Sequence, residues 1–237
     1  MKHLVSLVGL IAFLMVVLPG PLYKFNMVEL GTAFAGFRLS VYVGGAALAL
    51  LLIQVLFMRK TVSLVSAVVT VIFAAVAIAM PINMMNTAKS VPPIHDISTD
   101  LINPPKFVAV VPLRADSPNP VAYAGEETAA QQRKAYPELK PLEYNQTQTE
   151  LVAAITKAME NLGWELVNSD VNNGIVEATD TTTWFGFKDD VVVRINDKGS
   201  KRVVDIRSKS RIGKSDLGKN AQRIKTLIEE LNAVVVE

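Results

Sequence analysis

The sequence predicts an α+β protein in which three membrane-spanning helices precede a domain with a four-stranded antiparallel sheet and two helices. Three observations support this fold class. Apolar residues dominate the first third of the chain, strand-like segments separated by turn signals fill the last third, and a proline-rich segment lies between them. We expect a membrane region at residues 1–81, a linker at 82–105 and the α+β domain at 106–237.

Charge is distributed as unevenly as apolarity. Residues 1–88 carry five Lys/Arg and one acid, a net +4, whereas residues 89–237 carry 19 Lys/Arg and 21 acids, a net −2, which together give the net +2 of the chain. A total so close to zero argues against nucleic acid as a partner. The chain has no cysteine, which excludes disulfides, thiol catalysis and cysteine–zinc sites.

Three apolar stretches are candidates for membrane spans, at about residues 4–23, 39–58 and 62–80. A span needs ~20 residues to cross a hydrocarbon core ~30 Å thick, and the second and third stretches meet that requirement without a charge. The first meets it only if it continues past its Pro-Gly-Pro triplet to about Tyr23. No small-residue cleavage site follows it, so we expect an uncleaved anchor, with the lipid bilayer as a partner.

The orientation of the spans depends on few charges. Lys2, Arg59 and Lys60 fall on one side of the predicted spans, and an excess of Lys and Arg marks the cytoplasmic side. In a bacterium this predicts a multi-pass inner-membrane protein with a periplasmic C-terminal domain. The spans hold no Asp, Glu, Lys, Arg or His between their ends, so a pump or ion-coupled transporter is not expected.

Small residues recur at every fourth position in two of the spans. Ser66, Thr70 and Ala74 form one ridge, and Gly45 and Ala49 form another. Ridges of this kind allow helices to approach closely. They suit packing within the three-helix set and packing with another subunit equally well.

The linker is extended, because its four prolines disfavour helix. Its polar residues His95, Asp96 and Asp100 allow two interpretations. The only other histidine, His3, stands at the amino terminus, so a metal site would need one histidine plus carboxylates, and we expect no metal. The preferred interpretation is a hydrogen-bonded turn that docks the linker on the domain.

Local signals define the elements of the domain. A strand is expected at Phe107–Leu113, and a capping box at Thr147–Glu150 begins a helix that Gly163 ends. Asn-Gly and Asp-Lys-Gly turns then separate four strands, which we place at about residues 164–167, 175–181, 191–195 and 202–212. A closing helix follows at about 217–234, and both helices are expected on one face of the sheet.

The most basic part of the domain is residues 203–224, called here the basic segment. Between Lys198 and Lys225 the chain has ten Lys/Arg and two acids. Strand alternation places the cations of the strand on one face, and bases in the first half of the next helix oppose the helix dipole. These observations favour an anion- or partner-binding site at Arg207, Lys209, Arg211, Lys214, Lys219 and Arg223.

A solvated basic face, partly paired with acids of the same domain, is the competing interpretation. Exposed ion pairs contribute only ~0–1 kcal/mol each, so replacing Arg207 and Arg211 by Gln should change stability little, and if the cations form an anion site it should cause a large, salt-sensitive loss of binding. Residues 213–220 nearly match a phosphate-cradling loop. We reject that interpretation, because Asn220 replaces the magnesium-binding hydroxyl and Asp216 would place a carboxylate among phosphates.

Four motifs, PPIHDISTD, GWELV, FGFKDDVVVRI and VDIRSKSRIGKSDLGKNAQRI, resemble the family called domain of unknown function 1499. The resemblance covers roughly Pro92 to Leu231, and in membrane-anchored members the amino-terminal spans as well. It implies a membrane-anchored envelope setting. It implies no activity, cofactor or catalytic residue.

No nucleophile elbow, glycine-rich strand–helix fingerprint or metal-ligand cluster stands in the sequence, so no cofactor is expected. We expect a non-catalytic binding or assembly module that meets an anionic envelope component or a partner membrane protein. Two alternatives stay open. One is a structural subunit of a membrane complex. The other is a membrane-anchored enzyme acting on an anionic envelope substrate held by Arg207 and Arg211, with an acid or base among Asp189, Asp190, Asp205 and His95.

Overall fold

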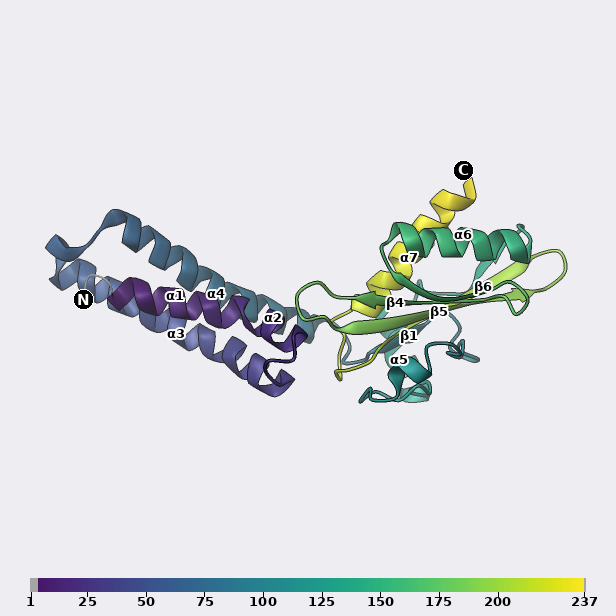
Figure 1. Ribbon diagram of the computed structural model, residues 1–237, viewed down its shortest axis with the longest axis horizontal. Helices are drawn as coiled ribbons and strands as arrows, with labels where there is room; N and C mark the ends of the chain where they lie inside the picture. Colours follow the sequence, from purple (N-terminus) through teal and green to yellow (C-terminus); the bar gives the residue numbers. More distant parts are fainter. Residues whose placement is uncertain (1–3, 237) are drawn as a thin grey trace. The chain divides into compact units, whose positions relative to one another are not determined.

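The computed structural model describes residues 4–236, and these form two compact units. The helical unit consists of residues 4–89 together with Thr183–Gly186. The α+β unit consists of Ser90–Thr182 and residues 187–236. The mixed α+β class is as predicted, and the elements of each unit are labelled in Figure 1.

The helical unit contains two helices that are long and apolar enough to cross a membrane, among the residues described. They are α3 (Leu30–Phe57) and α4 (Leu64–Ser90), joined through a short 3-10 helix at Arg59–Thr61. The expected first span divides into α1 (Leu4–Val17) and α2 (Pro19–Lys24). At ~1.5 Å per residue α1 covers only ~21 Å, so the prediction of three spans is wrong in its first member.

Two prolines explain why the first apolar stretch divides. Pro19 and Pro21 have no backbone N–H, so the carbonyls of Met15 and Val17 lack their helical donors. The carbonyl that Pro21 leaves without a helical donor is that of Val17. It accepts a hydrogen bond from the indole nitrogen of Trp184 instead, at 3.0 Å. Lys2 and His3, which entered the predictions of orientation and metal binding, lie outside the described residues.

A third proline has a similar consequence inside α4. Pro81 cannot donate to the carbonyl of Ala77, four residues before it. Ser40 of α3 compensates, because its buried hydroxyl lies 3.0 Å from the Ala77 carbonyl oxygen and 2.7 Å from that of Phe37. An unpaired carbonyl in apolar surroundings is costly. The proline of one helix is therefore matched by a serine of another.

Small residues bring the helices of this unit together. Thr70 and Ala74 of α4 are buried, with Gly9 of α1 against Thr70 and Gly44 of α3 against Ala74. This part of the predicted ridge packs within the unit. The other predicted pair differs, because a methyl group added at Gly45 would meet no atom within 4 Å.

The α+β unit is built on an antiparallel sheet of six strands in the described chain, rather than the four expected, in the order β1-β6-β5-β4-β3 with β2 also paired to β6. The strands are β1 (Asp96–Ser98), β2 (Leu142–Tyr144), β3 (Glu165–Asp170), β4 (Ile175–Thr181), β5 (Lys188–Asp197) and β6 (Arg202–Ser210). The last four match the predicted strands. The two additional strands have three residues each, too few for alternation to reveal, and they pair along successive halves of β6.

Helices α6 (Gln148–Asn161) and α7 (Lys219–Val236) lie on one side of the sheet, as predicted, and α5 (Glu126–Ala135) lies on the other (Figure 1). The capping box of Thr147 and Glu150 at the start of α6 is confirmed. Fully buried apolar side chains of both helices and the sheet form the core, among them Ile155, Met159, Val193, Ile206 and Leu227.

The opposite face of the sheet is covered by residues 99–125, called here the covering segment. The strand predicted at Phe107–Leu113 is wrong, since this stretch forms turns and a 3-10 helix at Pro112–Arg114. The amides of Val108 and Ala109 donate to the carboxylate of Glu177, at 2.8 and 2.6 Å, instead of to a neighbouring strand. A side chain of β4 thus takes the place of a strand partner.

Replacing Ser40 by Ala should lower the thermal stability of the full chain in detergent. The carbonyl of Ala77 would lose its donor, which costs ~1–3 kcal/mol for a buried group. Ser66→Ala, in α4, is the matched control. Pro81→Ala restores a backbone N–H, so Ser40→Ala should cost much less in that background. An equal cost in both backgrounds would contradict the compensation.

Candidate functional site

The predicted site residues of β6 belong to a buried network of charges under the covering segment. Alternation along the strand aims Arg207 and Lys209 at this face, and strand pairing places Asp96 of β1 directly opposite Lys209. Arg207 donates to both carboxylate oxygens of Asp96, at 2.8 and 2.9 Å, and Lys209 donates to one of them at 2.8 Å. All three side chains are at most 2% exposed.

The two cations also bind the covering segment. Arg207 donates to the carbonyls of Pro105 and Val121, at 3.1 and 3.0 Å, and Lys209 donates to the carbonyl of Ala122 at 2.7 Å. The rings of Phe107 and Tyr123 also lie 4.9 and 5.4 Å from the Arg207 guanidinium carbon. These contacts tie the segment to the sheet through cations that would otherwise be buried with too few partners.

A second centre forms around Asp190 of β5. Its carboxylate accepts hydrogen bonds from Arg114 at 2.5 Å, from Arg211 at 2.8 and 2.9 Å, and from the hydroxyl of Thr179 at 2.7 Å. Burial alone would raise the pKa of Asp190, but the hydrogen bonds from Arg211, Thr179 and Arg114 outweigh it and the pKa is lowered. Asp190 is therefore held as a carboxylate by two arginines.

A third centre joins α7 to the end of the sheet. Arg223 donates to Asp180 at 2.9 Å and to Asp189 at 2.7 Å. It also donates to the side-chain oxygen of Asn220, at 2.7 Å, and that oxygen accepts from the hydroxyl of Ser208 at 2.6 Å. Arg223, one of the bases whose position opposes the helix dipole, is thus neutralised by two carboxylates of neighbouring strands.

Burial shifts the pKa of further groups in the unit. It lowers the pKa of Lys209 against the opposing attraction of Asp96, and it raises the pKa of Tyr123 to about 12, with Asp96 adding to the effect. Burial also raises the pKa of Asp205, although Arg194 and Asn196 donate to it. One oxygen of Asp205 is buried without a hydrogen-bond partner in the described chain.

The six cations proposed from the sequence do not gather on one surface. Arg207 and Lys209 are buried against Asp96, so the expectation that the Arg207 ion pair is exposed is wrong. Arg211 and Arg223 are held in the second and third centres described above. Lys214 and Lys219 are exposed, and neither forms an ion pair within residues 4–236.

The turn that carries these two lysines is closed by its own carboxylate. Asp216 accepts hydrogen bonds from the amides of Gly218 and Asn220, at 2.8 and 2.9 Å, at the start of α7. Burial raises the pKa of Asp216 in spite of these bonds. A phosphate would have to displace this carboxylate, which agrees with the rejection of a phosphate-cradling loop.

The three linker residues have different surroundings. Asp96 belongs to the first centre, and Asp100 pairs with Arg194 at 3.0 Å while it accepts from the amides of Ile102 and Asn103. The Nδ1 atom of His95 lies 3.3 Å from the carbonyl oxygen of Lys214. No group of three or more His, Cys, Asp or Glu that could hold a metal ion occurs among residues 4–236.

Two members of the network escaped the sequence analysis. Arg114 follows the expected strand at Phe107–Leu113 with no role predicted for it, and Glu177 binds two backbone amides. The hydrogen bonds from Arg114 to Asp190 and Ser210, and those that Glu177 accepts from Val108 and Ala109, cross 68 to 96 positions of sequence. No local pattern therefore reveals them. The one available signal is a lone arginine after the apolar run that begins at Phe107.

A family model described as protein of unknown function (DUF1499) matches residues 96–231. The match begins at Asp96 and extends to Leu231 of α7, so it includes all three centres of the charge network. The comparison with curated proteins finds no match.

Arg207→Gln should lower the free energy of unfolding of the full chain by ~3–5 kcal/mol, the cost of breaking a buried ion pair. Lys201→Gln removes the same charge from the exposed pair with Glu143 and should cost less than ~1 kcal/mol. Chemical denaturation followed by circular dichroism measures both. Equal losses of unfolding free energy in the two variants would show that the Arg207 ion pair is solvated and contradict its burial.

Proposed function

The chain belongs to the DUF1499 family, and from the geometry of its own residues we propose that it is a membrane-anchored, non-catalytic binding or assembly module. Its helical unit is the anchor in this proposal, and its α+β unit carries the binding surface. An anionic envelope component or a partner membrane protein is the proposed ligand. The main supporting observation is that some cations of the basic segment pair with carboxylates inside the α+β unit, whereas others remain exposed.

The exposed surface of the helical unit supports the anchor. Large apolar side chains of α3 and α4 are exposed, with Phe57 at 80%, Leu64 at 78% and Leu56 at 60%. Water disfavours such a surface, whereas the hydrocarbon of a bilayer accommodates it. The length and composition of these two helices fit a bacterial inner membrane, which we propose as the location.

The connection between α3 and α4 supports the proposed orientation. It contains Arg59 and Lys60, and such charges favour the cytoplasmic side. Because α4 is the span that follows this connection, the α+β unit is then periplasmic. This inference holds whether or not α1 crosses the membrane.

The exposed lysines support the binding role. The cations of β6 and Arg223 have carboxylate partners inside the unit, so their charge is already balanced. Lys214 and Lys219 have no such partner within residues 4–236 and can attract an anionic group. The acid–base candidates Asp189, Asp190 and Asp205 are buried and bound by arginines, which favours binding over catalysis.

A reporter that is active only outside the cytoplasm should be active when fused after Glu237 and silent when fused after Lys60. The physical reason is the positive charge of the connection at Arg59 and Lys60. The measurement is reporter activity at matched expression levels. The reverse pattern would move the α+β unit to the cytoplasm.

The double variant Lys214→Gln, Lys219→Gln should unfold within ~0.5 kcal/mol of the wild type, because both side chains are exposed. It should also lose binding to a partner whose affinity falls as the salt concentration rises. Purification of the tagged full chain in mild detergent, with quantification of co-purifying proteins and lipids, measures this loss. Lys157→Gln with Lys198→Gln is the charge-matched control, and an identical set of partners in all three proteins would contradict the proposed surface.

A further inference from the structure

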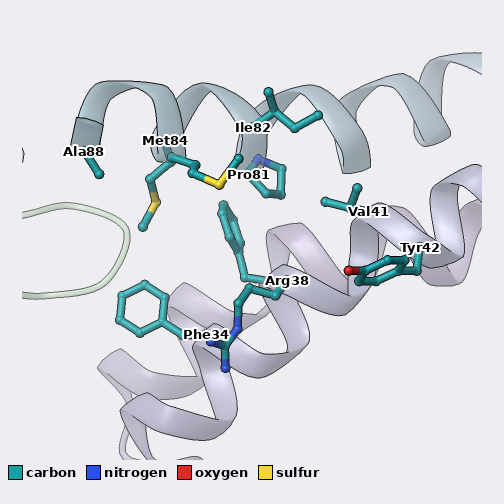
Figure 2. Close-up of a pocket in the computed structure, with 10 residues that line it drawn as sticks. Phe34, Arg38, Val41, Tyr42, Pro81, Ile82, Met84 and Ala88 are labelled. Carbon is teal, nitrogen blue, oxygen red and sulfur yellow. The ribbon is translucent and has the colours of Figure 1, made fainter. Parts of the chain in front are cut away.

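A cavity of about 600 Å³ lies between α3 and α4 in the helical unit (Figure 2). Its walls are apolar and bulky, and they come from both helices, with Phe34, Val41 and Tyr42 on α3 and Pro81, Met84 and Ala88 on α4. Cavities of ~300–1,000 Å³ are the size range of small-molecule sites in proteins. This cavity has the volume of a ligand site.

The position of the cavity follows from how the two helices pack. Gly44 lets α3 approach the backbone of α4 at Ala74, and Ser40 is bound to Ala77 one turn further along. Beyond that point the small residues are replaced by aromatic and methionine side chains, and the helices no longer fill the space between them. The cavity therefore lies toward the beginning of α3 and the end of α4. In a spanning pair these helix ends lie near one boundary of the bilayer.

One charged residue, Arg38, lines the cavity. Figure 2 shows its side chain leaving α3 at the same end as Phe34. Arg38 is exposed and forms no ion pair within residues 4–236. A guanidinium group can bind a phosphate through two parallel hydrogen bonds, and it does so more strongly in surroundings of low polarity.

An apolar cavity with one arginine at its edge matches an amphiphile with an anionic head. We infer that this cavity takes an acyl chain of an anionic phospholipid, with the lipid phosphate bound by Arg38. The inference rests on the proposed membrane anchor, because the bilayer supplies the ligand. Methionine side chains such as Met84 adapt their shape readily, which suits a flexible chain.

A helix of another protein fits this cavity less well. Helix docking sites in membranes use small residues that let backbones approach. Half of the residues in these walls are phenylalanine, tyrosine or methionine, and Ala88 is the one alanine, with no glycine, serine or threonine among them. An apolar helix docked in the cavity would also bury Arg38 without a counter-charge, which is unfavourable.

Native mass spectrometry of the delipidated full chain tests the inference, with phosphatidylglycerol, phosphatidylcholine and a free fatty acid as probes. Arg38→Gln should weaken phosphatidylglycerol binding about tenfold and phosphatidylcholine binding by a smaller factor, because the choline ammonium already offsets part of the phosphate charge. Val41→Trp should fill the cavity and weaken both phospholipids. The matched controls are Arg59→Gln, which removes a charge outside the cavity, and Leu52→Trp, which enlarges an exposed residue of α3.

Phosphatidylglycerol binding by Arg38→Gln at the wild-type level would overturn the inference, and this variant keeps the test valid if Val41→Trp does not fold. A fatty acid that binds more tightly than phosphatidylglycerol would overturn the phospholipid assignment. Carbonate extraction of membranes separates this inference from the proposed anchor. If the protein resists extraction and Arg38→Gln binds phosphatidylglycerol normally, only the lipid-site inference is overturned. If carbonate releases the protein, the proposed anchor is overturned.

Discussion

The pairing of Asp96 with both Arg207 and Lys209 is the interaction on which the α+β unit depends. Removing an ion from water costs several kcal/mol, and one carboxylate cannot balance two cations. The remaining donors must find oxygen atoms, and the covering segment provides them at Pro105, Val121 and Ala122. The short strand β1, the covering segment and β6 are thus joined by one set of charges. Loss of Asp96 would leave both cations buried without a carboxylate.

The helical unit follows the same rule with neutral groups. Pro81 deprives the carbonyl of Ala77 of its donor, and Ser40 restores one from a neighbouring helix. Buried polar atoms in apolar surroundings need a partner wherever it stands in the sequence. In both units the compensating residue belongs to a different element from the group it satisfies, so these contacts specify tertiary structure as well as stability.

Sequence reasoning succeeded where the signal is local and failed where the cause is distant. The capping box at Thr147, the turn at Gly174 and the alternation of β6 are properties of a few neighbouring residues, and the structure contains each of them. Strand β1 is stabilised by pairing across more than a hundred positions, so three residues could not reveal it. The expected strand at Phe107–Leu113 has the right composition, but Glu177 binds two of its amides and turn carbonyls bind two others.

Alternation determines which face of a strand carries the charges, but it does not determine whether water reaches that face. Antiparallel sheets often leave one face to solvent, and a charged face is then read as a surface. Here the covering segment shields that face from water. Arg207 and Lys209 therefore stabilise the fold, although their spacing along the strand is the same as on an exposed face. A cation is available to a ligand only when no internal carboxylate already balances it. Within the basic segment, Lys214 and Lys219 meet that condition, and the proposed binding surface therefore lies at the turn before α7 rather than along β6.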